Sequence, residues 1–216
     1  EVSHGNAIHR LVFLYIGQNM RCLDELMEIR QGFSLVCRSS KGERGLTTMA
    51  RENVPVLDTG VQFPSLELDA AGGGRLCLPT DFNGYWSVIL FCRGDWCRQD
   101  RQQLLDYELR TDVFSRLGIK VAAVFAEPRS IAESIVQDLR LTFPVGYGVD
   151  VKSAAGLTGA YYDDSTRERP FLHATGFLLD QEGKVFTAVY SSRSIGRITA
   201  QDAATMVEFA RRSKSR

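Results

Sequence analysis

The sequence predicts an α/β fold in which a mixed β-sheet lies between helices, as a three-layer sandwich. Two predominantly apolar runs, Trp86–Cys92 and Ile119–Phe125, are typical of strands that are buried on both faces. Each run is followed by a segment with helical spacing, and this alternation indicates a parallel centre of the sheet. Short strand pairs with glycine-containing turns, before and after this centre, indicate antiparallel strands.

The N-terminal part of the predicted sheet is a β-hairpin. Leu66–Leu68 and Arg75–Leu78 flank Ala70–Gly74, in which consecutive glycines supply the positive φ angles of a tight turn. The strand Trp86–Cys92 comes next. We then expect a charged helix over Arg98–Leu117, because its apolar residues recur near helical spacing.

The second half of the domain alternates in the same way. After the strand Ile119–Phe125 we expect a helix that begins with a capping box of Ser130 and Glu133 and runs to about Leu139. The other expected elements are a short strand Phe143–Val145, a short helix Val151–Tyr161, a hairpin of Thr175–Leu179 and Lys184–Tyr190 around Asp180–Gly183, and a last helix opened by Thr199 and Asp202.

Composition and charge narrow the class of protein. The chain has 216 residues with 26 basic and 26 acidic side chains, so its formal net charge is zero, and 44% of its residues are hydrophobic. A disordered chain would be less hydrophobic or more highly charged, and a nucleic-acid-binding protein usually carries a basic excess. No apolar run approaches the roughly 18 residues of a membrane span, and no secretory signal is visible. We therefore expect a cytoplasmic protein with no membrane or nucleic-acid partner.

The first 48 residues differ from the rest of the chain. They hold an apolar patch, Leu11–Ile16, and a polar stretch, Arg38–Gly45. From Met49 onward the sequence is that of a self-contained domain. We therefore predict an N-terminal extension over 1–48 and a domain over 49–216, the extension being either an accessory element or a stretch foreign to the domain.

Five cysteines, at positions 22, 37, 77, 92 and 97, are the candidate reactive groups. Their odd number and wide spacing argue against a disulfide scaffold and against a zinc site. Cys77 and Cys92 fall in predicted strands, where cysteine packs as a small hydrophobic residue. Cys97 instead follows the end of a buried strand and lies at the start of a helix. No metal or organic cofactor is implied by the sequence.

The position of Cys97 gives its thiol a physical reason to react. Reactive groups in open α/β sheets gather at the carboxyl ends of strands, and a helix start offers unpaired N–H groups and the positive end of the helix dipole. Both favour the thiolate, which is the nucleophilic form, and Arg93 or Arg98 would favour it further. Asp95 and Asp100 would oppose it unless arginines occupy their carboxylates.

The segment Arg93-Gly94-Asp95-Trp96-Cys97 resembles the active-site turn of the thioredoxin-fold redoxins, in particular the peroxiredoxin-like AhpC/TSA family, which often has Arg-Gly-x-Trp-Cys-Pro-x-Cys here. The segment Thr175–Lys184 is similar to the Thr-Phe-x-x-Asp-x-x-Gly segment of redoxins. The resemblance covers about residues 54–212. It implies a thioredoxin-like fold with Cys97 as the catalytic residue and with the four residues before it, and Arg98 after it, as the active-site loop.

The sequence departs from this family pattern at several positions. Arg98 stands where proline is common, and Asp100 replaces the second cysteine of the Cys-x-x-Cys pair. Leu90 and Gly94 stand where typical peroxiredoxins have a proline and a threonine. Ala174 replaces the arginine of the family, or the cis-proline of thioredoxins. The resemblance therefore implies a one-cysteine redoxin or a relative that has lost catalysis.

We expect a thiol-dependent oxidoreductase that reduces peroxides through Cys97, with an external thiol as reductant. Cys92 is a candidate resolving thiol, and His173, on a strand expected near the cysteine loop, is a candidate acid or base. Two alternatives stay open: a non-catalytic redoxin-fold module for interaction or redox sensing, and a monothiol protein that exchanges with disulfides. The expected partners are a peroxide or disulfide substrate, the external thiol and a second copy in a homodimer.

Overall fold

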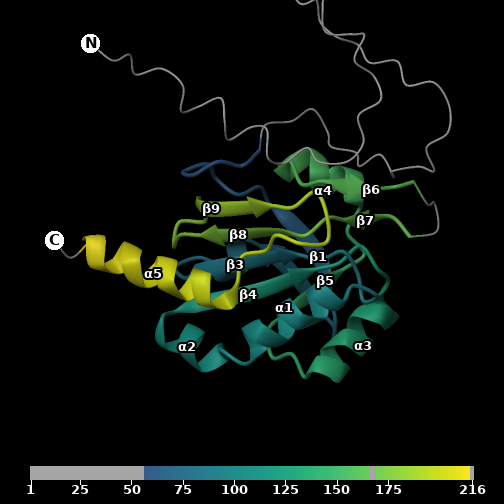
Figure 1. The fold of residues 1–216 in the computed structure, drawn as a ribbon, viewed down its shortest axis with the longest axis horizontal. Coiled ribbons are helices and arrows are strands. Elements are labelled where there is room, and N and C mark those ends of the chain that lie inside the picture. The colour runs from purple at the N-terminus through teal and green to yellow at the C-terminus, as the bar shows by residue number, and fades with distance from the viewer. Residues whose placement is uncertain (1–55, 166–168, 215–216) are drawn as a thin grey trace, which may run out of the picture. The chain divides into compact units, whose positions relative to one another are not determined.

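The computed structural model describes residues 56–165 and 169–214 (Figure 1). The predicted extension over 1–48, the expected domain start at Met49, and both Cys22 and Cys37 lie outside these residues. Among the described residues, no helix is both long enough and apolar enough to cross a membrane.

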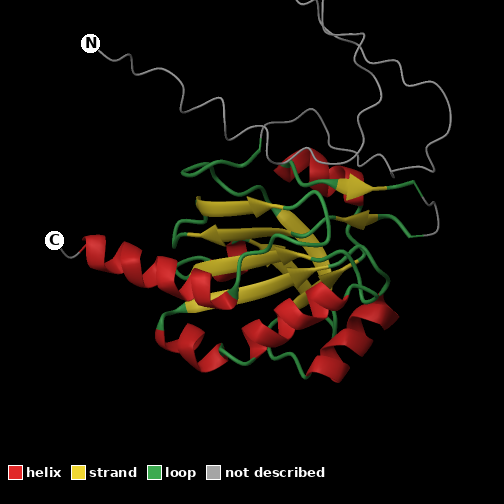
Figure 2. Ribbon diagram, in the orientation of Figure 1, coloured by secondary structure: helices red, strands yellow, loops and turns green. Residues whose placement is uncertain are grey.

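A seven-stranded mixed sheet forms the centre of the described part, which confirms the predicted fold class (Figures 1 and 2). In spatial order its strands are β2 (Arg75–Leu78), β1 (Leu66–Ala70), β5 (Val145–Tyr147), β4 (Ile119–Val124), β3 (Trp86–Phe91), β8 (Thr175–Leu179) and β9 (Val185–Tyr190). β3, β4 and β5 run parallel, whereas β1 with β2 and β8 with β9 form antiparallel hairpins. The two apolar runs are thus neighbouring central strands.

Helices cover both faces of this sheet, as Figure 2 shows. The core on one face includes side chains of α1 (Arg98–Glu108), α2 (Thr111–Arg116), α3 (Arg129–Leu139) and α5 (Ala200–Lys214), and the core on the other includes α4 (Val151–Thr158). Successive residues of β3 alternate between the two cores: Val88 and Leu90 enter the first, Ile89 and Phe91 the second. This explains why every residue of β3 is buried.

Two helix predictions were wrong in detail. The helix expected over Arg98–Leu117 is two helices, because Arg110 between them has φ −113° and ψ 14° and so leaves the helical conformation. The capping box predicted for Ser130 and Glu133 is absent. α3 already begins at Arg129, no side chain caps its first turn, and the Glu133 carboxylate instead accepts a hydrogen bond from Arg129 Nε at 2.7 Å.

Short elements were missed or displaced in the sequence prediction. A 3₁₀ turn and two short strands that pair as a separate small sheet were not expected: η1 (Thr80–Phe82), β6 (Tyr162–Asp163) and β7 (Phe171–Leu172). Segments of two or three residues carry no periodicity that could reveal them. α4 ends at Thr158 instead of Tyr161, because Gly159 takes a left-handed φ of 74°. The strand expected over Phe143–Val145 begins at Val145.

The closing hairpin and the start of the last helix agree with the prediction. In the turn between β8 and β9, Asp180 Oδ1 accepts the N–H of Lys184 at 2.9 Å. At the start of α5, Thr199 Oγ1 accepts the N–H of Asp202 at 3.1 Å and donates to its carboxylate at 2.7 Å. The hydrogen bonds between Thr199 and Asp202 therefore fix the C-terminal end of the loop between β9 and α5. This loop carries Arg197.

Candidate functional site

Cys97 lies where the chain passes from β3 into α1. Its backbone has φ −88° and ψ 105°, and its carbonyl oxygen accepts the first N–H groups of the helix, so it is the N-cap residue. Its N–H donates to Gly94 O at 3.0 Å, which closes a tight turn. A Cβ at Gly94 would lie 2.5 Å from Trp96 Nε1, so glycine is needed for close approach. Cys97 as a whole residue is 2% exposed.

Two guanidinium groups lie beside the sulfur of Cys97. Arg93 Nη1 is 3.7 Å from Sγ, and Arg197 Nη2 is 3.6 Å from it. Arg93 belongs to the same turn, whereas Arg197 comes from the loop between β9 and α5, one hundred residues later. A positive charge at this distance stabilises an anion, so both groups favour negative charge on the sulfur. The thiol of Cys97 also donates to Gln99 Oε1, at 3.5 Å.

Asp100 is fully buried beneath this turn. Its Oδ2 accepts the backbone N–H groups of Arg93 at 2.8 Å and Gly94 at 3.2 Å, and its Oδ1 accepts a hydrogen bond from Arg197 Nη2. The sequence predicts that this carboxylate opposes a thiolate unless an arginine occupies it. Arg197 does occupy it, and the same guanidinium also reaches the sulfur.

The Asp95 carboxylate also has an arginine partner, although it is less buried than Asp100. Its carboxylate forms an ion pair with Arg101, which reaches Asp138 at 3.1 Å as well. Its backbone N–H donates to Glu127 Oε2 at 2.6 Å. Burial raises the pKa of the Glu127 carboxyl, while the hydrogen bond from Asp95 acts in the opposite direction. The turn is thereby tied to the loop that follows β4.

Arg98 does not join the group around the sulfur. It is exposed, and among the described residues the hydrogen-bond partners of Cys97 Sγ do not include it. The second arginine at the sulfur is Arg197, which sequence reasoning missed. No signal in the sequence could have found it, because Arg197 belongs to no motif and is brought in by the loop before α5.

Aromatic rings position the Arg93 guanidinium. Its central carbon lies 4.6 Å from the ring centre of Trp96 and 5.1 Å from that of Phe171, and the two rings meet edge to face at 5.3 Å. Trp96 is 47% exposed, so it forms the outer wall of the turn. Arg93, Trp96 and Phe171 also line a cavity of about 280 Å³, together with Glu127 and Arg169.

His173 belongs to the same wall. Its ring packs edge to face on Phe171 at 5.2 Å, and the residue is 4% exposed. Burial, and then the positive charge of Arg93, lower the pKa of His173, so the imidazole is neutral near pH 7. Among the described residues, neither ring nitrogen makes a hydrogen bond of good geometry. His173 is not a hydrogen-bond partner of the Cys97 sulfur.

Cys92, which the sequence predicts as the last residue of its strand, lies directly after β3 and is fully buried. Its Sγ lies 3.8 Å from Leu90 O, and its thiol is free, as are those of Cys77 and Cys97. Burial raises the pKa of the Cys92 thiol well above its ordinary value, and the negative charge of Asp100 raises it further. A thiol that stays protonated is a weak nucleophile, which argues against a resolving role.

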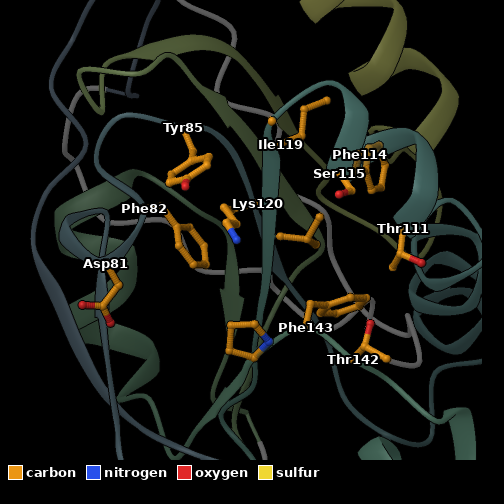
Figure 3. Close-up of a pocket in the computed structure, with 13 residues that line it drawn as sticks. Asp81, Phe82, Tyr85, Thr111, Phe114, Ser115, Ile119, Lys120, Thr142 and Phe143 are labelled. Carbon is orange, nitrogen blue, oxygen red and sulfur yellow. The ribbon is translucent and has the colours of Figure 1, made fainter.

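A larger cavity, of about 530 Å³, lies at the opposite end of the parallel strands (Figure 3). It is lined at the amino end of β4 by Ile119 and Lys120, whereas Cys97 follows the carboxyl end of β3. Lys120 Nζ lies 4.9 Å from the ring centre of Tyr85. No cysteine or histidine lines this cavity, and in the described part of the chain no cluster of three metal-ligating side chains is present. The candidate site is therefore the turn around Cys97.

Comparisons with known proteins identify the family and the fold. The model of the AhpC/TSA family matches residues 59–188, which is more than half of the chain. Comparison with curated proteins gives no significant match. Among solved structures, peroxidoxin BcpB from Mycobacterium tuberculosis aligns with a TM-score of 0.61 at 14% identity, over 71% of this chain and 97% of that one.

Two further structures have the same fold. Enterococcus faecalis AhpC aligns with a TM-score of 0.62 at 16% identity, over 74% of this chain and 96% of that one. A yeast mitochondrial 1-Cys peroxiredoxin aligns with a TM-score of 0.61 at 12% identity, over 74% of this chain and 79% of that one. At these identities the likeness shows a shared thioredoxin-like, peroxiredoxin-type fold, and together with the family match it establishes that the chain belongs to the AhpC/TSA family.

Proposed function

We propose that the chain is a thiol peroxidase whose peroxidatic group is Cys97. One observation supports this most strongly: the guanidinium groups of Arg93 and Arg197 lie within 3.7 Å of a buried sulfur at a helix start. The two positive charges stabilise the thiolate, which is the nucleophile. The same charges would stabilise the negative charge that develops on the leaving oxygen in the transition state.

The proposed reaction uses one cysteine. The Cys97 thiolate attacks the terminal oxygen of the peroxide ROOH, so that an S–O bond forms, the O–O bond breaks and the alkoxide RO⁻ leaves and takes a proton to become ROH. Cys97 is then a sulfenic acid. An external thiol condenses with it to give a mixed disulfide and water, and a second thiol releases Cys97 as the thiol together with an external disulfide.

The need for an external thiol follows from the groups around Cys97. Asp100 stands at the position of a second cysteine, and Cys92 is buried with a raised pKa. The yeast mitochondrial 1-Cys peroxiredoxin is a fold relative whose thiol is resolved via glutathione/thioredoxin systems. We propose a reductant of one of these two kinds for this chain, a low-molecular-weight or a protein thiol, and keep Cys92 as the less favoured resolving group.

The remaining expectations belong to the same proposal. They are that residues 49–216 form the functional domain, that the protein acts in the cytoplasm as a homodimer, and that it needs no metal or organic cofactor. His173 is proposed as an acid or base of the site with less support, because it does not contact the sulfur.

A second candidate function is a redox-sensing or interaction module that does not turn over peroxide. The observation that favours it is the absence of a hydroxyl group at residue 94, where peroxiredoxins have a threonine. A third candidate is monothiol exchange with disulfides, which requires only a reactive Cys97.

One experiment separates the three candidates. The reduced full chain is treated with limiting hydrogen peroxide in the presence of a dimedone-type probe, and the adduct is located by mass. A peroxidase gives the adduct at Cys97 and consumes peroxide catalytically when a thiol is supplied, and Cys97→Ser abolishes both. Labelling without turnover supports the sensing module. Rapid mixed-disulfide formation with no adduct supports exchange, and the last two results both overturn the peroxidase proposal.

A further inference from the structure

We infer that Asp100 is a positioning residue that holds the Arg197 guanidinium against the Cys97 sulfur. The inference rests on the proposed role of Cys97. A Cys-x-x-Cys protein has a second thiol at this place, and the present chain has a carboxylate that recruits a distant arginine instead. In the described part of the chain, Asp100 is not a hydrogen-bond partner of the sulfur, and it acts through Arg197.

The contacts of Asp100 account for both of its oxygens. One accepts two backbone N–H groups of the cysteine turn, and the other accepts from Arg197 Nη2. The Arg197 side chain is 10% exposed and that of Asp100 is 1% exposed, so the ion pair is buried. Arg197 Nη1 donates to Ser194 O, which holds the guanidinium from its other side. The orientation of this arginine is therefore set by Asp100 and by its own loop.

The helix that carries Asp100 also seats the loop that carries Arg197. Gln103 Nε2 donates to Ile198 O at 2.9 Å, and Tyr107 Oη donates to the same oxygen at 3.3 Å. Asp100, Gln103 and Tyr107 are spaced by three and four residues, so they lie on one face of α1. All three are buried. A buried polar stripe on α1 thus binds two consecutive residues of the loop, Arg197 and Ile198.

Two effects of Asp100 on the sulfur act in opposite directions. Its negative charge opposes a thiolate directly, whereas its hold on Arg197 favours one. The direct effect is reduced because three donors satisfy the carboxylate. Without Asp100, the buried Arg197 would lose its counter-ion, which is strongly unfavourable for a buried charge. We expect the guanidinium then to leave the sulfur, so that the second effect exceeds the first and removing the carboxylate weakens the thiolate.

The sign of one measurement distinguishes these effects. The rate of alkylation of Cys97 by iodoacetamide is followed against pH in the full chain, with the modified peptide quantified by mass. In Asp100→Asn we expect the pH midpoint of the alkylation rate to rise and the rate with hydrogen peroxide to fall about tenfold. Simple removal of a repelling charge would instead lower the midpoint. The control Glu208→Gln removes an exposed carboxylate of α5 that pairs with Arg212, and it leaves both values unchanged.

A double variant tests the coupling of the two side chains. In the Arg197→Ala background, adding Asp100→Asn is expected to raise the midpoint no further, because the carboxylate favours the thiolate only through the arginine. Additive effects, or a midpoint that falls or stays unchanged in Asp100→Asn, overturn the inference. If Asp100→Asn does not fold, Arg197→Gln is measured instead, and unchanged values in that variant overturn it equally. The alkylation profile does not depend on peroxide turnover. Failure of the peroxidase proposal would instead be seen in the unaltered chain, as absence of the sulfenic acid adduct at Cys97.

Discussion

Cys97 is buried, and the charged groups around its sulfur are largely paired with one another. The sulfur is almost fully buried, yet two cations and the first turn of α1 surround it, while both nearby carboxylates have arginine partners. At the scale of single residues, the chemistry therefore depends on Arg93 and Arg197 more than on residue 98, where the sequence indicated a stabilising charge.

Replacing the sulfur tests the nucleophile directly. Cys97→Ser should lower the rate of peroxide consumption by a factor on the order of 10³ or more, because a hydroxyl is a far weaker nucleophile than a thiolate. Peroxide consumption with a supplied thiol is the measurement. Cys77→Ser, in β2 and distant from the turn in sequence, is the matched control and keeps the rate of the unaltered chain.

Gly94 tests how tightly the turn is packed. Gly94→Ala brings a methyl group to 2.5 Å from Trp96 Nε1, so Trp96 must move and the free energy of unfolding should fall by about 1–3 kcal/mol. Chemical unfolding measures the loss, and tryptophan fluorescence reports the displaced ring. Gly156→Ala is the control: a Cβ there meets nothing within 4 Å, and alanine in α4 should leave stability unchanged or raise it by up to about 1 kcal/mol. An equal loss in both variants would contradict this account.

Some helices and strands could be predicted from a pattern in the nearby sequence, and others could not. β3 and the start of α1 could be predicted because a buried strand, a turn and a helix follow one another within 20 residues. The break between α1 and α2 could not, since it depends on the backbone of Arg110 and on no helix-breaking residue. Arg197 joins the site through a tertiary contact across one hundred residues, and no periodicity reports such a contact.

Helix starts provide a test at the scale of elements. Thr199→Ala removes the side-chain cap of α5 and should lower the free energy of unfolding by about 1 kcal/mol. Ser130→Ala is the matched control. Ser130 lies inside α3 and does not cap it, so its replacement should change stability by less than about 0.5 kcal/mol. Urea unfolding of both variants measures the difference, and a larger loss in Ser130→Ala would restore the capping box predicted from the sequence.

In the described part of the molecule, the candidate site and the cavity of about 530 Å³ lie at opposite ends of the parallel strands. The turn of Cys97 follows the carboxyl end of β3, and the cavity of about 530 Å³ opens at the amino end of β4. The fold class and the parallel centre of the sheet could be predicted from the alternation of elements, because connection rules allow few topologies. The spatial order of the seven strands was not predicted. The packing of the loop before α5 onto α1 could not be predicted, because it depends on tertiary contacts between distant parts of the chain.

The stability of the whole fold should depend on the charge of His173. Its pKa is lowered in the folded state by burial and by Arg93, so the unfolded chain binds a proton more readily. Stability contributed by neutral His173 is therefore present above the ordinary histidine value of about 6.5 and is lost as pH falls below it. Urea unfolding between pH 7.5 and 5.5 should show a smaller loss in His173→Gln than in the unaltered chain. An identical pH dependence in both would contradict this assignment.

The ion pair between Asp100 and Arg197 has an evolutionary consequence. A single change of Asp100 to cysteine would restore the spacing of a Cys-x-x-Cys motif, but it would leave Arg197 buried without a counter-ion and two N–H groups of the turn without an acceptor. An ancestor or descendant with two thiols is therefore separated from this chain by at least two coupled substitutions, one of them about a hundred residues away. Residues 100 and 197 should accordingly vary together among relatives, as an epistatic pair.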